Sequence, residues 1–228
     1  GGGGGGWRER RYYVFFGKRV YKNNNHDAIL SPPAPRARFP SSVGDPYPEM
    51  LVYTDIEDST KAAAENPAAM IIVQEVHDRV MRQGIQRFAG YEVHTQGDAF
   101  EVAFATAVSA VQFCLWTQEQ LKSADWPKLV LRVPEFAETF DENEDVIIRG
   151  PRVRMGVHAA KPGTWAKRVH GYTHHTIFGG EGVDLIATVS DAGHGGQVIL
   201  TKDAADALIP RIHKVDALLE SIGTFRIP

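Results

Sequence analysis

The sequence of 228 residues lacks the disulfide bonds that stabilise small secreted proteins and the long apolar runs that span a membrane. It holds a single cysteine, Cys114, so no disulfide can form within the chain. No apolar run approaches the roughly 18 residues that a membrane-spanning helix needs. The formal net charge is only −3, without the basic excess of nucleic-acid binding proteins. These shortages agree with a globular protein of a reducing compartment that does not bind nucleic acid.

The composition changes along the chain. A hydrophobic content of 43% is enough for one good core. Residues 1–47 differ: a glycine run leads into a basic and aromatic segment at 7–22, followed by a proline-rich stretch. We therefore expect a basic and aromatic arm with a proline-rich linker over residues 1–47, and one domain over residues 48–228.

Two interpretations of the arm remain open. Basic and aromatic residues together suit an anionic surface, which favours a membrane-proximal or partner-docking arm. The alternative is an extended arm packed on a neighbouring protein, or a fragment of a longer chain. We expect a location on the cytoplasmic side, attached to a membrane protein or to a larger complex.

The apolar pattern predicts the order strand, helices, hairpin, helix, strand, which is typical of an α+β, ferredoxin-like fold. Residues 126–150 form an acidic, loop-like insertion with room for a short hairpin. Helices are predicted at residues 68–88, 105–122, 181–191 and 202–208. Strands and hairpins are predicted at residues 49–54, 92–104, 152–158, 161–178, 197–201 and 223–227.

Two aspartates stand where β-like runs end. Asp55 closes the strand at 49–54, and Asp98 lies in the Gly97-Asp98 turn of the hairpin at 92–104. If the two strands lie side by side, both carboxylates converge on one divalent cation. Such a pair suits Mg²⁺, which keeps several waters and takes its other oxygens from substrate phosphates. The alternative is structural: a strand-end cap and a turn aspartate.

Four motifs in order carry a resemblance to a known family. They are Tyr53-Thr54-Asp55-Ile56-Glu57-Asp58-Ser59-Thr60, Gly97-Asp98-Ala99-Phe100, Val153-Arg154-Met155-Gly156-Val157-His158 and Gly195-Gly196-Gln197-Val198-Ile199-Leu200-Thr201. Together they resemble the class III nucleotidyl cyclases, the adenylyl and guanylyl cyclase homology domain. The opening motif is most similar to those of trypanosomatid, algal and bacterial cyclases. The resemblance covers roughly residues 48–228.

The resemblance implies a ferredoxin-like catalytic domain with an antiparallel-rich central sheet flanked by helices. By the family pattern, we expect the domain at residues 48–228 to lack the last strand. The implied reaction converts ATP or GTP into the 3′,5′-cyclic monophosphate and pyrophosphate, with two Mg²⁺ or Mn²⁺ ions per site. By resemblance, the ions are held by Asp55, Asp98 and the backbone carbonyl of Ile56. The implied phosphate-binding groups are Arg154 and the backbone amides of Glu57, Asp58, Ser59 and Thr60.

Four positions depart from the family pattern. The base-reading positions hold His94, where lysine or glutamate is usual, and Ile177, where Asp or Cys is usual. The transition-state asparagine and arginine are replaced by Asp184 and Thr188. The resemblance therefore implies the metal-binding half of a composite site, active with a second cyclase-like domain in a homo- or heterodimer and nearly inactive alone. The alternative is a degenerate pseudo-cyclase that serves as a scaffold or regulatory subunit.

Two further groups suggest weaker alternatives. His170 and His174, with His158 and His175 nearby, hint at zinc, but no cysteine accompanies them and scattered histidines on a hairpin are favoured. The acidic run at residues 141–145 is interpreted as a solvated loop, with a regulatory cation site as the alternative.

Overall fold

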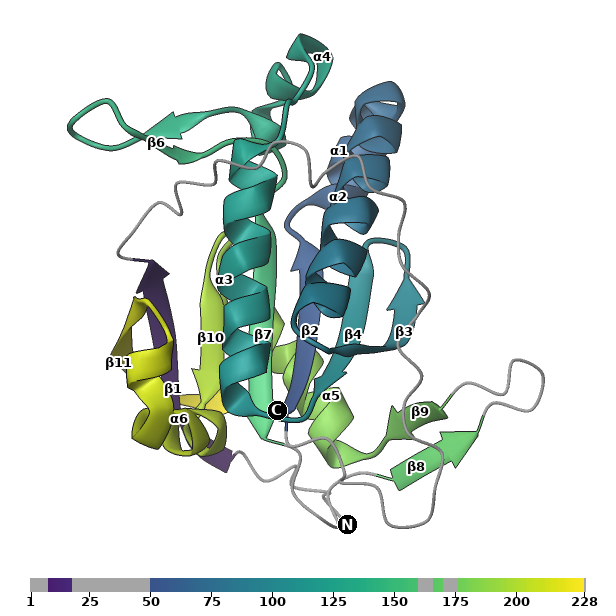
Figure 1. Cartoon of the computed structure of the whole chain (residues 1–228). Coiled ribbons are helices and arrows are strands. Elements are labelled where there is room, and N and C mark those ends of the chain that lie inside the picture. Colours follow the sequence, from purple (N-terminus) through teal and green to yellow (C-terminus); the bar gives the residue numbers. More distant parts are fainter. Residues whose placement is uncertain (1–7, 18–49, 160–165, 170–175, 228) are drawn as a thin grey trace, which may run out of the picture.

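The computed structural model describes residues 8–17, 50–159, 166–169 and 176–227, and within them the predicted α+β class is confirmed. The strands of its large sheet are β1 (Arg8–Gly17), β2 (Met50–Ile56), β3 (Tyr91–Gln96), β4 (Ala99–Phe104), β7 (Val153–Ala159), β10 (Val198–Thr201) and β11 (Ala217–Ile227). Their order across the sheet is β11-β1-β10-β7-β2-β4-β3 (Figure 1). Every neighbouring pair is antiparallel except β7 and β10.

Helices cover both faces of this sheet (Figure 1). On one face lie α1 (Ser59–Glu65), α2 (Pro67–Arg87), α3 (Ala107–Ser123) and α6 (Lys202–Leu208), and on the other lies α5 (Glu181–Asp191). The helices predicted at residues 68–88, 105–122, 181–191 and 202–208 correspond to α2, α3, α5 and α6. Each helix in the described part of the chain is too short or too polar to span a membrane.

Strand β2 lies in the middle of the sheet, paired with β4 on one side and β7 on the other. Its side chains alternate between the two faces. Val52 and Ile56 join the large core under α2 and α3, whereas Leu51 and Tyr53 pack in clusters on the face that α5 covers. Asp55 continues this second row. The carboxylate that ends β2 therefore belongs to the α5 side of the sheet.

Helix α5 rests directly on the sheet. Leu185, Ile186 and Val189 bury their side chains against Ile199 and Tyr53. A Cβ at Gly156 on β7 would stand 2.8 Å from the Ser190 nitrogen and 2.9 Å from the Ile186 oxygen. The absent side chain lets the helix backbone touch the strand. The C-terminal end of α5 is thereby fixed beside the middle of β7.

The N-terminal segment differs from the separate arm that the sequence predicted. Residues Arg8–Gly17 form β1, which pairs with β10 on one edge and with β11 on the other. The aromatic and β-branched stretch at residues 12–16 is typical of a strand, which explains this placement. The boundary predicted at residue 47 therefore does not separate these residues from the sheet. The part of the predicted arm and linker at residues 18–47 lies outside the described residues.

The insertion at residues 126–150 is more ordered than a loop. It contains α4 (Lys128–Leu131), the short 3₁₀ helix η2 (Pro134–Phe136) and a hairpin of β5 (Thr139–Phe140) and β6 (Val146–Ile148). Trp126, Val130 and Phe136 are buried in the main core, which anchors the insertion to the domain. The hairpin predicted at 161–178 is present as β8 (Ala166–Val169) and β9 (Thr176–Gly179).

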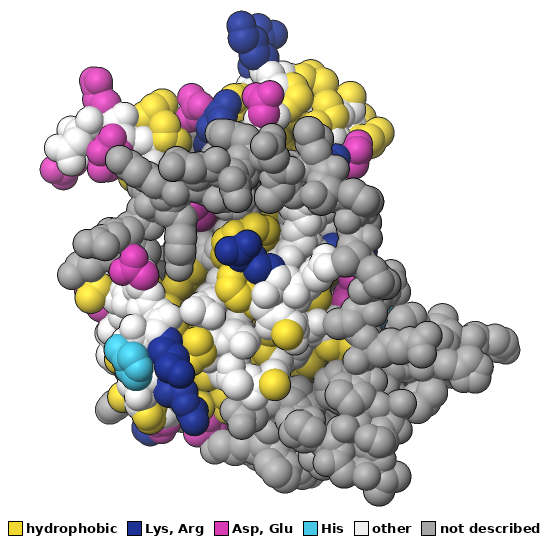
Figure 2. Space-filling model, viewed as in Figure 1, with side chains coloured by type: hydrophobic (Ala, Val, Ile, Leu, Met, Phe, Trp, Pro, Cys, Tyr) yellow, Lys and Arg dark blue, Asp and Glu magenta, His cyan; other side chains and the backbone are white. Residues whose placement is uncertain are grey.

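Apolar side chains are exposed at the end of the molecule formed by α4 and the start of α2. Ile71 on α2 and Leu129 on α4 are 70% and 52% exposed. In the space-filling view, hydrophobic side chains gather at this end, near the top of the picture (Figure 2). The remainder of the described surface in this view mixes charged, polar and apolar groups.

Candidate functional site

The β3–β4 turn brings Asp98 to the end of β2. Gly97, the first residue of this two-residue turn, has a φ of 62°, a left-handed conformation that glycine adopts without strain. The Oδ2 atom of Asp98 accepts a hydrogen bond from the Ile56 backbone nitrogen at 2.9 Å. Ile56 directly follows Asp55. The structure therefore brings together Asp55, Ile56 and Asp98, which the sequence predicted as one site.

Asp55 lies in a partly buried, negatively charged environment. Burial raises the pKa of its carboxyl above the ordinary value, the hydrogen bond from Arg154 opposes that rise, and the charge of Asp98 adds to it. Arg154 stands opposite Asp55 in the β2–β7 register and donates through Nη2 to Asp55 Oδ2. The same guanidinium lies 3.5 Å from Asp191 Oδ1 at the end of α5. Positive charge is favoured here, and Arg154 supplies part of it.

These donors fit a hard divalent cation. Two neighbouring carboxylates and a main-chain oxygen are the oxygen ligands that Mg²⁺ prefers. Within the described part of the chain, no three His, Cys, Asp or Glu side chains gather into a metal-binding group. An ion at Asp55 and Asp98 would therefore complete its ligands with main-chain, water and nucleotide oxygens, as the sequence predicted.

The segment after β2, residues 57–60, carries the backbone amides that the sequence predicted to bind phosphate. Asp58 occupies the N-cap position of α1 in a left-handed conformation (φ 58°), without a capping hydrogen bond from its side chain. Ser59 and Thr60 open the helix, where backbone amides have no intrahelical acceptor. The amide of Glu57 differs, because it donates to the Arg152 carbonyl at 2.9 Å. A phosphate bound by the Glu57 amide would have to replace that bond. Phosphate binding at residues 57–60 stays a prediction.

Four positions depart from the family pattern, and three of them lie on the face of the sheet that α5 covers or on α5 itself. The side chain of the fourth, Ile177, is not described. His94 is exposed on β3, and Asp184 is exposed in the first turn of α5. Thr188, one turn later, donates its hydroxyl to the Asp184 carbonyl at 3.3 Å. Ile177 lies in β9, in register with Arg168, and its side chain is outside the described part. Thr188 therefore provides no positive charge at the position where the family has arginine.

Sequence reasoning missed Glu101. It lies opposite His94 in the β3–β4 register and opposite Tyr53 in the β2–β4 register. Burial raises the pKa of Glu101, the charge of His94 opposes the rise, and the charge of Asp184 reinforces it. Strand alternation could have found this residue, because Phe100 is buried in the main core and the next side chain must face α5.

We expect Glu101→Gln to raise the melting temperature at pH 8 by about 2 °C. The folded-state pKa of Glu101 lies above its unfolded value, so the ionised carboxylate destabilises the fold at pH values above the folded pKa. This penalty disappears as the pH falls below the unfolded value, about 4.3. Thermal unfolding from pH 4 to 8 would measure the difference between variant and wild type. A gain that is constant across this range would contradict the assignment.

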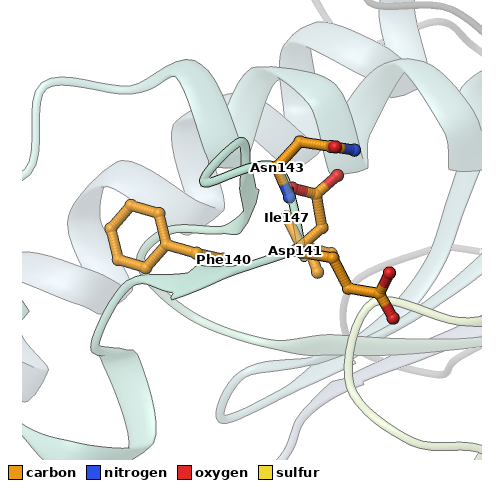
Figure 3. Close-up of a pocket in the computed structure, with 5 residues that line it drawn as sticks. Phe140, Asp141, Asn143 and Ile147 are labelled. Atoms are coloured by element: carbon orange, nitrogen blue, oxygen red, sulfur yellow. The ribbon is translucent and has the colours of Figure 1, made fainter.

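The weaker alternatives receive no added support. Residues 141–145 are exposed, and Asp141 Oδ1 already accepts the Asn143 and Asp145 amides at 2.8 and 2.9 Å. These bonds lower the pKa of Asp141. An open pocket at this hairpin is lined by Phe140, Asp141, Glu142, Asn143 and Ile147 and shares no residue with the Asp55–Asp98 site (Figure 3).

The histidine group is divided. His158 is buried, with Nδ1 3.0 Å from Thr201 Oγ1. The other three, His170, His174 and His175, lie outside the described residues. The favoured interpretation of this hairpin as one with scattered histidines stays a prediction.

Comparison with known proteins shows the family to which the chain is similar. Residues 47–222 match the family model described as the adenylate and guanylate cyclase catalytic domain. The chain is 36% identical over 164 residues to an adenylate cyclase of Neurospora crassa, covering 72% of this chain and 7% of that protein. It is 34% identical over 173 residues to an adenylate cyclase of Mycosarcoma maydis, covering 75% of this chain and 7% of that protein. The chain thus spans about 7% of the length of these fungal relatives.

A solved structure shares the fold. An adenylate cyclase from Trypanosoma brucei, studied in its monomeric state, superposes with a TM-score of 0.63 at 28% identity, covering 76% of this chain and 77% of that one. The similarity to trypanosomatid cyclases that the opening motif predicted is thus found among the matches.

Proposed function

Because the chain belongs to the family of adenylate and guanylate cyclase catalytic domains, we propose that it is the metal-binding half of a nucleotidyl cyclase site. The reaction would convert ATP or GTP into the 3′,5′-cyclic monophosphate and pyrophosphate. The observation that carries the proposal is the hydrogen bond from the Ile56 amide to Asp98, which holds that carboxylate beside Asp55. A second cyclase-like domain, in a homo- or heterodimer, would complete the site.

Each residue of this half has a task in cyclisation. The ribose 3′-hydroxyl must be aimed in line at the α-phosphorus while charge builds on the departing pyrophosphate. Asp55, Asp98 and the Ile56 carbonyl would hold two Mg²⁺ or Mn²⁺ ions. When bound, these ions lower the pKa of the hydroxyl and neutralise phosphate charge. The amides at the start of α1 would orient the terminal phosphates, and Arg154 would exchange Asp55 for a phosphate oxygen.

The other half of the chemistry is incomplete in this chain. Asp184 places a negative charge where the family has a neutral amide, and Thr188 offers a hydroxyl where the family has a cation. The Thr188 hydroxyl is moreover engaged with the Asp184 carbonyl. A partner with the full set would supply these groups. The same residues favour the second candidate, a pseudo-cyclase that acts as a scaffold or regulatory subunit.

We also propose a location on the cytoplasmic side, attached to a membrane protein or to a larger complex. The basic and aromatic residues at 7–22 support the attachment, because such residues suit an anionic surface. Cell fractionation of the native protein would test this placement.

The metal site is tested by nucleotide binding. We expect the chain alone to bind nucleoside triphosphate weakly in Mg²⁺ or Mn²⁺, and Asp55→Ala or Asp98→Ala to remove that binding. Titration with a fluorescent ATP or GTP analogue, with and without a chelator, measures it. Asp145→Ala, on the exposed β5–β6 hairpin, is the control and should bind as wild type does. Equal binding by wild type and both site variants would rule out the metal-binding half.

A further inference from the structure

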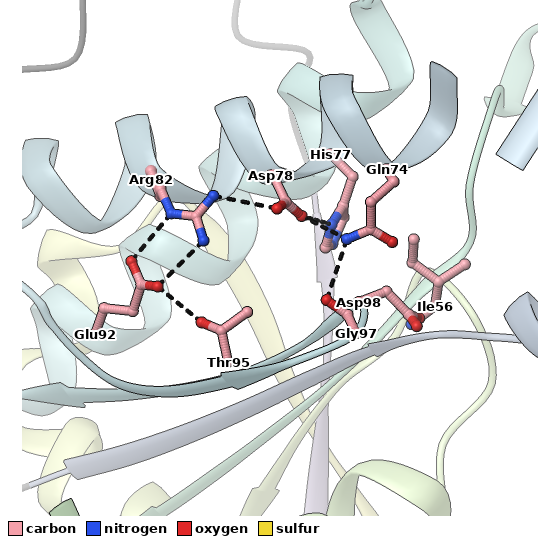
Figure 4. Close-up of polar contacts among 9 residues, drawn as sticks. All are labelled: Ile56, Gln74, His77, Asp78, Arg82, Glu92, Thr95, Gly97 and Asp98. Atoms are coloured by element: carbon pink, nitrogen blue, oxygen red, sulfur yellow. Dashed lines mark hydrogen bonds and ion pairs between the residues drawn. The ribbon is translucent and has the colours of Figure 1, made fainter. Parts of the chain in front are cut away.

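Helix α2 reaches over the β3–β4 hairpin with a row of polar side chains (Figure 4). Gln74, Asp78 and Arg82 are spaced four residues apart, so they lie along one face of the helix. The Gln74 amide donates through Nε2 to the Gly97 carbonyl at 3.1 Å and to Asp78 Oδ1 at 2.7 Å. Gly97 directly precedes Asp98. A helix side chain thus holds the backbone of the turn that carries the predicted metal ligand.

The other end of the row holds the start of the same hairpin. Arg82 donates from Nε and Nη2 to Glu92 on β3, each at 3.2 Å, and Glu92 accepts the Thr95 hydroxyl at 2.8 Å. The Arg82 guanidinium also lies over the Phe100 ring, 5.1 Å from its centroid. The hairpin is therefore attached to α2 near both ends of β3.

Asp78 joins the two ends. Its carboxylate accepts from Gln74 on Oδ1 and from Arg82 on Oδ2 at 3.1 Å, and His77 Nδ1 stands 3.3 Å from Oδ1. Burial would raise the pKa of Asp78, but the contacts with His77, Gln74 and Arg82 lower it overall. Asp78 is therefore ionised at neutral pH. Its charge fixes which way the Gln74 amide points.

We propose that Gln74 is a positioning residue for the metal site. It holds the Gly97 carbonyl so that the next residue, Asp98, stays aimed at the end of β2, and Asp78 orients Gln74. This inference rests on the proposed function, in which Asp98 is a metal ligand. Groups that orient metal ligands typically change metal affinity by roughly 10- to 100-fold when they are lost.

The test is Gln74→Leu in the full chain, a change of similar size that removes both donated hydrogen bonds. Binding of Mn²⁺ is measured through the spin-resonance signal of the free ion, in the presence of a non-cleavable ATP or GTP analogue. We expect the Kd for Mn²⁺ to rise by about 10-fold. With a complementary partner present, the Mn²⁺ concentration for half-maximal activity should rise by the same factor, while the rate at saturating Mn²⁺ stays near that of wild type.

The chain offers a matched control. On α3, Gln112 also donates through Nε2 to a backbone carbonyl distant in sequence, that of Lys214 at 3.0 Å, which is not part of the β3–β4 turn. Gln112→Leu should leave the Kd for Mn²⁺ unchanged. Asp78→Ala should weaken binding in the same direction as Gln74→Leu. The double variant should bind no more weakly than Gln74→Leu alone, because both residues act through the Gly97 carbonyl.

The outcomes separate this inference from the proposed function. If Asp98→Ala loses Mn²⁺ while Gln74→Leu binds as wild type, the positioning role is wrong and the metal site stands. If Gln74→Leu and Gln112→Leu weaken binding equally, the effect is general loss of stability and the positioning role is also wrong. If Asp98→Ala binds Mn²⁺ as wild type, the proposed function fails, and the inference fails with it.

Discussion

A homodimer carrying Asp184→Asn and Thr188→Arg should form cyclic nucleotide at least about 10³-fold faster than the wild-type homodimer. The wild type should be close to background, since both of its composite sites lack a cation for the charge that develops on the phosphates. Arginine restores that cation. Asparagine removes the repelling carboxylate from the first turn of α5. Adding His94→Lys and Ile177→Asp should shift the preference toward ATP. Production of cAMP and cGMP in Mg²⁺ and Mn²⁺ measures both effects.

The repaired homodimer contains its own control. Asp98→Ala added to the repaired chain should return the rate to background if the new activity uses the predicted metal site. Rapid turnover by the unmodified homodimer would show that the alignment of Asp184 and Thr188 with the family's asparagine and arginine is wrong.

A mixed dimer should be active with no change to the wild-type chain. Its partner would be a second copy that carries all four replacements together with Asp98→Ala, so that it offers the base side but no metal side. One of the two composite sites is then complete, and the mixture should be at least about 10³-fold more active than either chain alone. Activity titrated against the mixing ratio, with each chain tagged separately, measures this.

The metal side must come from the wild-type chain in that mixture. Replacing the wild-type chain by its Asp55→Ala variant should abolish the cyclase activity of the mixed dimer, whereas replacing it by Asp145→Ala should not. If the wild-type, repaired and mixed dimers all form no cyclic nucleotide, the scaffold interpretation is favoured over the catalytic one.

Local pattern predicted much of this structure. The β-branched and aromatic residues within 49–54 predicted β2, and the glycine of the Gly97-Asp98 turn predicted the hairpin. Those two signals, with the resemblance, were enough to place Asp55 and Asp98 together. The helices were predictable for the same reason, since α2 buries residues at helical spacing, such as Val73, His77 and Val80.

Contacts between distant segments escaped this reasoning. The hydrogen bond from Gln74 to the Gly97 carbonyl joins a helix to a turn 23 residues away, and no local sequence pattern predicts it. The electrostatic interaction of Glu101 with His94 and Asp184 depends on strand register and on where α5 packs against the sheet. The place of β1 depends on pairing with strands at the opposite end of the chain, so composition alone suggested an arm outside the domain.

The position of β1 has a practical consequence for producing the protein. In the sheet order, β11 reaches β10 only through β1, so β1 is the strand that ties the C-terminal strand to the rest. A protein shortened to the family-matched residues 47–222 would lose β1 and the end of β11. It would leave the backbone groups of β10 unpaired along an open edge, which invites strand-to-strand aggregation between copies. Soluble, monodisperse material is therefore expected only when residues 8–17 are retained.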